Sequence, residues 1–77
     1  MRFRQYGDNS ATLKEWAKQL NVVNQGKYPL YPTVENTINH WKNELNNNIG
    51  INTFEISNTP ESTLYSWQEK LNKIYNN

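Results

Sequence analysis

The chain has 77 residues, of which 35% are hydrophobic and 19% charged, and its formal net charge is +1. A chain this short buries only a small core, and without cysteine it has neither disulfides nor thiolate metal ligands to reinforce that core. The size and composition argue against a self-contained enzyme and a zinc finger. A membrane protein is also not expected, because no apolar run approaches the roughly 18 residues of a membrane span.

Three tryptophans, five tyrosines and two phenylalanines indicate a chain that packs rather than a disordered one. We therefore expect a single domain over residues 1–77. The segment Met1-Arg2-Phe3-Arg4 is not followed by the apolar stretch of a signal peptide, so a cytoplasmic location is expected. The first 26 residues carry a net charge of +2 and residues 53–77 a net charge of −1, so an anionic partner would meet the first third of the chain.

Three segments, 12–21, 37–46 and 63–72, share the pattern Thr-[Leu/Ile]-x-x-Trp-x-x-x-Leu-Asn without gaps. An aromatic residue lies nine positions before each threonine, at Phe3, Tyr28 and Phe54. Such agreement predicts three internal repeats of about 25 residues, spanning approximately 2–21, 27–46 and 53–72.

Each repeat is predicted to consist of an extended segment followed by a helix. The extended segments are 2–6, 27–31 and 53–57, of which the first and third can form short edge strands. The second contains Pro29 and is followed by Pro32, neither of which can donate to a sheet ladder, so it cannot be a central strand. The fold class is therefore mainly α, a small three-helix domain.

The apolar positions i, i+3 and i+7 of the pattern form one stripe of a helix and predict helices near 10–21, 34–47 and 60–75. The expected N-caps are Asp8, Thr33 and Thr59. In the first repeat, Thr12-x-x-Glu15 can instead form a capping box, which would start that helix later. The asparagines at the end of the pattern are expected to end the helices, because asparagine tolerates the left-handed conformation. These are Asn21, Asn46 and Asn72.

The stripe residues and the aromatic residue before each helix are the predicted core. They are Phe3, Leu13, Trp16, Leu20, Tyr28, Ile38, Trp41, Leu45, Phe54, Leu64, Trp67 and Leu71. The alternative for the tryptophans is an exposed ladder that stacks on sugars or bases. Four residues outside the stripe are better candidates for an exposed aromatic surface, namely Tyr6, Tyr31, Tyr65 and Tyr75.

Catalytic and metal-binding patterns are lacking, since the chain has one histidine, one aspartate and no cysteine. His40 has no ligand spacing around it and is interpreted as an ordinary surface side chain. No glycine-rich phosphate loop is present. We expect a non-enzymatic protein with no cofactor and no metal.

The segment Thr12-Leu13-Lys14-Glu15-Trp16-Ala17-Lys18-Gln19-Leu20-Asn21-Val22 looks like the first helix of helix-turn-helix modules from phages and mobile elements. Similarly, Thr59-Pro60-Glu61-Ser62-Thr63-Leu64-Tyr65-Ser66-Trp67 resembles the recognition helix of transposase- and excisionase-type domains. Together these segments cover about a third of the chain. In such families the start of the second helix faces the major groove.

The resemblance implies DNA contacts at Glu61, Ser62, Tyr65 and Ser66, with Lys70 and Lys73 on phosphate. The basic residues of the first third, Arg2, Arg4, Lys14 and Lys18, complete the candidate nucleic-acid-binding set. The expected function is thus a DNA-binding protein of a phage or mobile element. The alternative is a repeat-built module that binds a cell-wall glycan or a protein.

Overall fold

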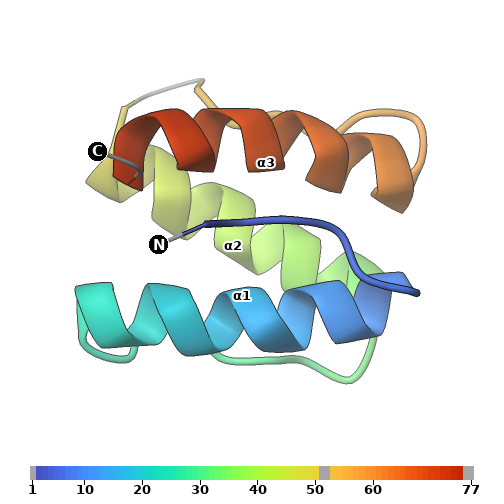
Figure 1. Cartoon of the computed structure of the whole chain (residues 1–77), viewed down its shortest axis with the longest axis horizontal. Helices are drawn as coiled ribbons and strands as arrows, with labels where there is room; N and C mark the ends of the chain where they lie inside the picture. The colour runs from blue at the N-terminus through green and yellow to red at the C-terminus, as the bar shows by residue number, and fades with distance from the viewer. Residues whose placement is uncertain (1, 51–52, 76–77) are drawn as a thin grey trace.

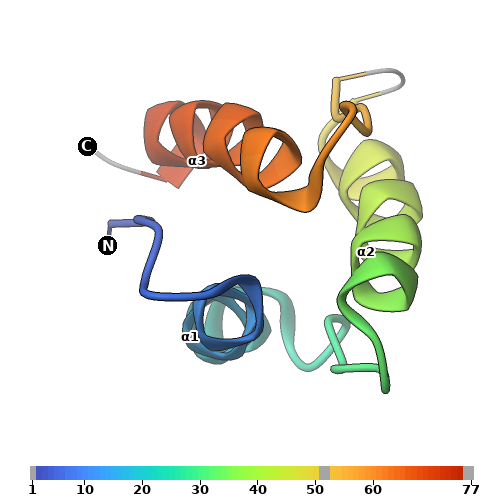
Figure 2. The ribbon, with the colours of Figure 1, turned by 90° about the vertical axis from the view of Figure 1, so that its right-hand side faces the viewer.

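The computed structural model describes residues 2–50 and 53–75 and contains the helices α1 (Asn9–Asn24), α2 (Val34–Asn48) and α3 (Pro60–Tyr75). All three run in the same direction, so their N-terminal ends lie at the same end of the molecule (Figure 1). Viewed along this direction, the helices form the corners of a triangle, and the extended segments lie between them (Figure 2). The predicted three-helix, mainly α class is confirmed.

The helices begin where the sequence predicts. The Asp8 side chain accepts a hydrogen bond from the Ala11 amide at 2.8 Å, and Thr33 caps α2 in the same way. In α3 the Thr59 hydroxyl accepts a hydrogen bond from the Ser62 amide at 3.1 Å. Pro60, the next residue, is the first residue of the helix. The capping-box alternative for the first helix is wrong, because α1 already begins at Asn9.

The prediction that the repeated asparagines end the helices is wrong. Each helix continues for two or three residues beyond its asparagine, to Asn24, Asn48 and Tyr75. The left-handed residue after α1 is Gln25, with φ 59°. The side chain of each repeated asparagine instead binds the backbone of an extended segment.

The geometry of this contact is the same at all three positions. Asn21 accepts a hydrogen bond from the Tyr28 amide at 2.7 Å and donates to the Tyr28 carbonyl at 3.0 Å. Asn46 makes the same pair of bonds to Phe54, at 2.8 and 3.0 Å. A side-chain amide thus pairs with a backbone residue as a neighbouring strand would.

Residues 2–6 and 53–57 do not form the predicted edge strands. Their backbone groups pair with side chains of the helices instead of with another strand. In the first segment, the Tyr6 amide donates to the Thr12 hydroxyl at 2.9 Å and the Arg4 carbonyl accepts from Trp16 Nε1 at 2.8 Å. Backbone groups satisfied in this way have no need of a sheet ladder.

The other two segments are held in the same way, by the equivalent threonine and tryptophan of the helix that follows each of them. Trp41 donates to the Pro29 carbonyl and Trp67 to the Glu55 carbonyl, at 2.9 and 3.0 Å. Each pattern threonine also donates to the carbonyl of the N-cap residue four positions earlier. This double hydrogen bonding explains why Thr12, Thr37 and Thr63 are buried although they are polar.

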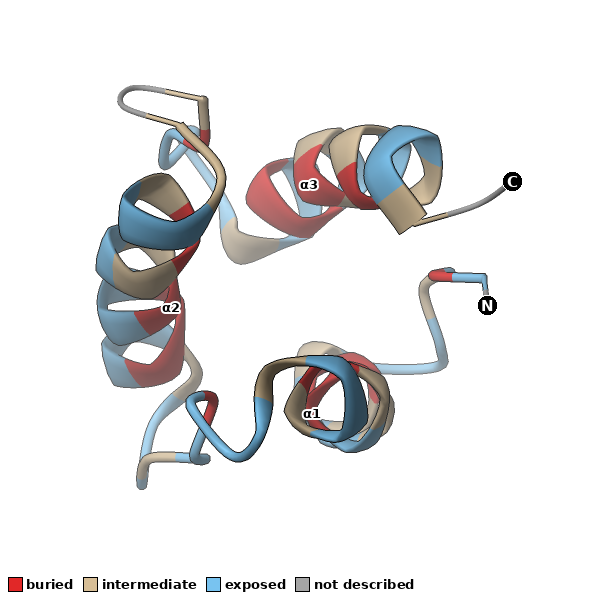
Figure 3. Cartoon of the chain, turned by 90° about the vertical axis from the view of Figure 1, so that its left-hand side faces the viewer, coloured by how far each residue is buried: buried red, intermediate tan, exposed pale blue. Residues whose placement is uncertain are grey.

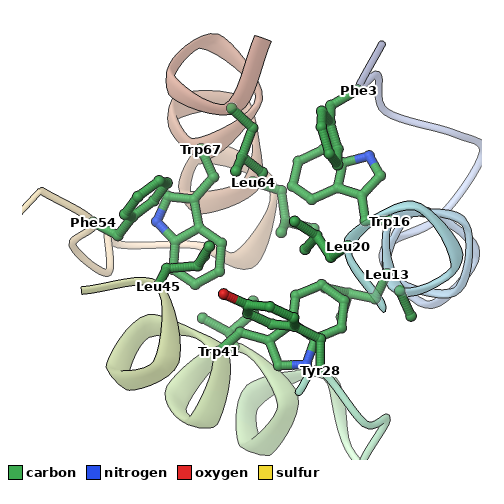
Figure 4. Packing of buried hydrophobic residues seen from close by; sticks show 13 residues of the cluster. Phe3, Leu13, Trp16, Leu20, Tyr28, Trp41, Leu45, Phe54, Leu64 and Trp67 are labelled. Carbon is green, nitrogen blue, oxygen red and sulfur yellow. The ribbon is translucent and has the colours of Figure 1, made fainter. Parts of the chain in front are cut away.

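The buried faces of the three helices point toward the centre of the triangle (Figure 3). All twelve predicted core residues are buried, with at most 3% of any of them exposed, and Ala17 joins them. Each tryptophan meets the aromatic ring of its own repeat edge to face, with ring centres 5.6–5.7 Å apart (Figure 4). The core interpretation of the tryptophans is confirmed, and the exposed ladder is wrong.

Candidate binding grooves between the helices

A groove lies between the first turns of α1 and the segment that leads into α2. It encloses about 220 Å³. We call it the Leu30 groove; it is lined by Ser10, Leu13, Lys14, Leu30, Tyr31, Pro32, Thr33, Val34 and Thr37. Leu13 and Thr37 are buried and form its floor, whereas Leu30 remains 47% exposed.

A second groove of about 210 Å³ lies between α2 and the segment that leads into α3. We call it the Ile56 groove; it is lined by Glu35, Ile38, Asn39, Ile56, Ser57, Asn58, Thr59, Pro60 and Thr63. Each of these residues stands 25 or 26 positions after its counterpart in the Leu30 groove. Ile56 occupies the place of Leu30 and is 44% exposed.

The equivalent place between α3 and the N-terminal segment is built differently. Gln5 stands where the other two segments have Leu30 and Ile56, and its side chain donates to the Glu61 carbonyl at 3.1 Å. Tyr65 stands at the rim position that Lys14 holds in the Leu30 groove, and 55% of it is exposed. The exposed aliphatic side chain is therefore a property of two of the three interfaces.

The two grooves also differ in charge. The Leu30 groove carries Lys14, whose counterpart in the Ile56 groove is the neutral Asn39. The Ile56 groove carries Glu35, whose counterpart in the Leu30 groove is Ser10. Each groove thus has one charged lining residue, of opposite sign.

Of the four predicted basic residues of the first third, Arg2 and Arg4 lie on the N-terminal segment, and Lys14 and Lys18 lie one turn apart on α1. Arg4 lies over the Tyr6 ring, 5.9 Å from its centre, on the segment that packs against Thr12 and Trp16 of α1. Lys14 lies on the side of α1 that faces residues 30–34. Lys18 is paired with Glu15 at 3.4 Å, and Arg2 is exposed beside the buried Phe3.

The predicted DNA-contacting residues of α3 fall into two groups. Glu61, Ser62, Tyr65 and Lys73 are exposed, and Ser66 is half-buried. Lys70 is turned inward, where its ammonium donates to the Thr53 carbonyl at 2.6 Å and lies 5.8 Å from the centre of the Phe54 ring. A phosphate contact by Lys70 would compete with these interactions, and the DNA-binding role of the remaining residues stays a prediction.

The four tyrosines predicted to form an aromatic surface are distributed over the molecule. Tyr6 and Tyr65 are exposed, whereas Tyr31 and Tyr75 are half-buried. Tyr31 stacks on His40 with ring centres 4.1 Å apart, which places the single histidine on the surface next to the Leu30 groove. Tyr75 packs on Phe3 and its hydroxyl contacts Asn24.

Within residues 2–50 and 53–75, no three His, Cys, Asp or Glu side chains come close enough together to hold a metal ion. In the same part of the chain, no helix has the length and apolar character needed to cross a membrane. The helix connections comprise residues 25–33 and 49–59, both longer than the three or four residues that join a helix-turn-helix motif. Searches of protein-family models, curated proteins and solved structures each found no match.

Leu30 and Ile56 were not predicted as functional residues. Both lie in the extended segments, outside the apolar stripe of the helices, and the first segment has glutamine at this position. The signal that could have identified them is the alignment itself, since an aliphatic residue recurs two positions after the core aromatic residue in the second and third repeats.

Proposed function

We propose that this protein is a non-enzymatic binding module, built from three copies of one unit, that takes up two aliphatic side chains of a partner protein. The observation that carries this proposal is the contrast between Gln5 and its counterparts Leu30 and Ile56. Because the first segment has Gln5 at this position, the packing of a unit does not require an apolar side chain at the position of Leu30 and Ile56. Leu30 and Ile56 nevertheless leave nearly half of their surface exposed, each at a groove.

The lining of the grooves favours aliphatic groups over sugars. Each groove has a buried aliphatic residue in its floor, Leu13 or Ile38, and an exposed one beside it. Polar residues also line both grooves, but apolar atoms make up more of the exposed lining than polar atoms do, as in sites for apolar side chains. Among the described residues, no aromatic ring lines the Ile56 groove, so a sugar ring would have no stacking surface there, whereas Tyr31 lines the Leu30 groove.

Nuclear magnetic resonance titration with the neutral compound N-acetyl-leucinamide tests the proposal. In the wild-type protein we expect the compound to shift the backbone amide signals of Lys14, Thr37, Asn39 and Thr63, which line the two grooves. The matched variant is Leu30→Gln/Ile56→Gln, which gives all three segments the residue of the first. This variant is expected to keep its melting temperature and lose the shifts.

Absence of groove-specific shifts in the wild type, at millimolar concentrations of the compound, would refute the proposal. Sedimentation of the protein with purified peptidoglycan would instead support the cell-wall alternative. If the double variant retained the shifts, the exposed aliphatic side chains would not be the binding groups.

DNA binding is a second candidate, favoured by the position of the N-terminal segment. This segment lies against α3, since Phe3 is hydrogen-bonded to Asn72 and Gln5 is hydrogen-bonded to Glu61. Arg2 and Arg4 therefore accompany the helix that carries the predicted DNA contacts. A phage or mobile-element origin and a cytoplasmic location belong to this candidate.

A gel-shift experiment with duplex DNA tests this second candidate. The affinity for DNA is expected to fall steeply as salt is raised. Binding releases counterions from the phosphates, and this release favours binding less when the salt concentration is high. Arg4→Glu is expected to weaken the complex, whereas Lys27→Glu, a charge reversal on the next extended segment, is the control. A protein that binds no duplex at low ionic strength would eliminate this candidate.

A further inference from the structure

We infer that the two grooves select aliphatic side chains with oppositely charged neighbours. The Leu30 groove takes an aliphatic side chain that lies beside a carboxylate, and the Ile56 groove takes one that lies beside an ammonium or guanidinium group. This inference rests on the proposed function and adds to it the chemistry and the orientation of the partner.

The two grooves are lined from equivalent positions of the chain but carry different charged side chains. Lys14 is the charged lining residue of the Leu30 groove, and Glu35 that of the Ile56 groove. Their counterparts, Asn39 and Ser10, are neutral, so each groove presents a single sign of charge next to its apolar floor.

Both charged groups are available to a partner. Lys14 and Glu35 are exposed, and the salt bridge found among the described residues joins Lys18 to Glu15 instead. Glu35 lies in the first turn of α2, where the helix dipole favours a negative charge. Lys14 lies in the second turn of α1, so its presence at the rim has no such explanation.

The partner that fits is a protein surface with two aliphatic side chains, one next to an acidic and the other next to a basic residue. Since the Leu30 and Ile56 grooves are not interchangeable in charge, such a surface would bind in one orientation. Exposed ion pairs contribute little, so we expect a preference of about two- to fivefold for the matching charge at each groove. High salt should remove this preference because it screens exposed charges.

Two small probes with the same leucine side chain and opposite charge test the inference. N-acetyl-leucine carries a carboxylate, and leucinamide carries an ammonium group at a pH of about 7. In titrations at low salt, N-acetyl-leucine is expected to bind the Leu30 groove more tightly than leucinamide does. The order should be reversed at the Ile56 groove, as followed by the amide signals of Thr37 and Thr63 respectively.

The matched variants exchange each charged residue for its own counterpart in the other groove. Lys14→Asn should abolish the preference for N-acetyl-leucine at the Leu30 groove and leave the Ile56 groove unchanged. Glu35→Ser should abolish the preference for leucinamide at the Ile56 groove only. Each variant is thus a control for the other.

The outcomes separate the inference from the proposed function. If neutral N-acetyl-leucinamide binds both grooves but the charged probes show no preference, the charge selection is wrong and the binding module stands. If no leucine probe binds either groove, the proposed function fails and the inference fails with it. Equal preferences in the wild type and in both variants would also overturn the charge selection.

Discussion

Asn72 and Phe3, 69 positions apart in the sequence, exchange two hydrogen bonds of 2.6 and 2.8 Å. The pair has the same donors and acceptors as Asn21 with Tyr28 and Asn46 with Phe54. The third unit is therefore joined to the first by the same contact that joins the first to the second. Side-chain amides close the three units into a ring.

Asn72→Ala should lower the free energy of unfolding by about 1–3 kcal/mol, because the amide and carbonyl of buried Phe3 lose their partners. Asn46→Ala should cost a similar amount, since it opens an equivalent contact. Urea denaturation measures both. Asn47→Ala, at the exposed neighbouring position, is the control and should stay within about 0.5 kcal/mol of the wild type. An Asn72 variant as stable as this control would show that the ring contact contributes nothing.

Thr37→Val should destabilise the protein by about 1–3 kcal/mol although it preserves the shape of the side chain. The hydroxyl accepts from the Tyr31 amide and donates to the Thr33 carbonyl, and valine can do neither. Hydrogen exchange of the Tyr31 amide provides a direct measurement and should become faster. Thr37→Ser keeps the hydroxyl and should preserve the protection of this amide; equal exchange in both variants would contradict the assignment.

Trp41→Ala should cost about 3–5 kcal/mol, enough to unfold a chain with so small a core. The indole is buried, packs edge to face on Tyr28 and donates to the Pro29 carbonyl. Thermal melting followed by circular dichroism measures the effect. Asn43→Ala on the exposed face of the same helix is the control. Cooperative melting of the Trp41 variant near the wild-type temperature would be incompatible with this packing.

Stability should decrease in alkaline solution through Tyr28. Burial raises the pKa of its hydroxyl above the usual 10.0, against the opposing effect of the hydrogen bond from Asn48 and with smaller raising effects of Tyr75 and Glu44. A folded-state pKa above the unfolded one stabilises the protein fully below a pH of about 10. This contribution is lost as the pH rises through the folded-state value, because the unfolded chain releases its proton first.

The matching variant is Tyr28→Phe, which places at this position the residue that the first and third repeats already have. Melting temperatures measured between pH values of about 8 and 11 should fall less in Tyr28→Phe than in the wild type. Parallel curves would mean that other groups cause the alkaline loss.

The core was predictable because the repeat marks each buried position three times. A stripe of leucine and tryptophan at helical spacing identifies its face without any tertiary information. The helix starts were also predictable, since the side chains of Asp8, Thr33 and Thr59 each accept a hydrogen bond from a backbone amide only three positions later. Local chemistry of this kind can be read from a single sequence.

The role of the repeated asparagines was not predictable from local rules. An asparagine after the last stripe leucine satisfies the rule for a helix end, whereas its real partner lies in the following unit. For Asn72 that partner is Phe3, and nothing in the order of the sequence places them together. Edge strands at 2–6 were predicted for a related reason, because the alternation of an extended segment does not reveal whether strands or side chains pair with its backbone.

The grooves escaped prediction because they depend on the contact between successive units. The sequence shows Leu30 and Ile56 as isolated apolar residues in polar segments. Only the packing of α1 on the second segment, and of α2 on the third, places these side chains beside Leu13 and Ile38.

A ring of three equivalent joints has no privileged first unit. Two of the joints are crossed by the chain, between α1 and α2 and between α2 and α3. The third is held by noncovalent contacts, among them the two hydrogen bonds of Asn72 with Phe3 and the hydrogen bond from Gln5 to Glu61. Connecting the ends by a short linker and opening the chain near the exposed Gly26 would therefore preserve every contact of the core. By the same geometry, each unit contains both halves of such a joint, an aromatic residue before its helix and an asparagine near the end of it.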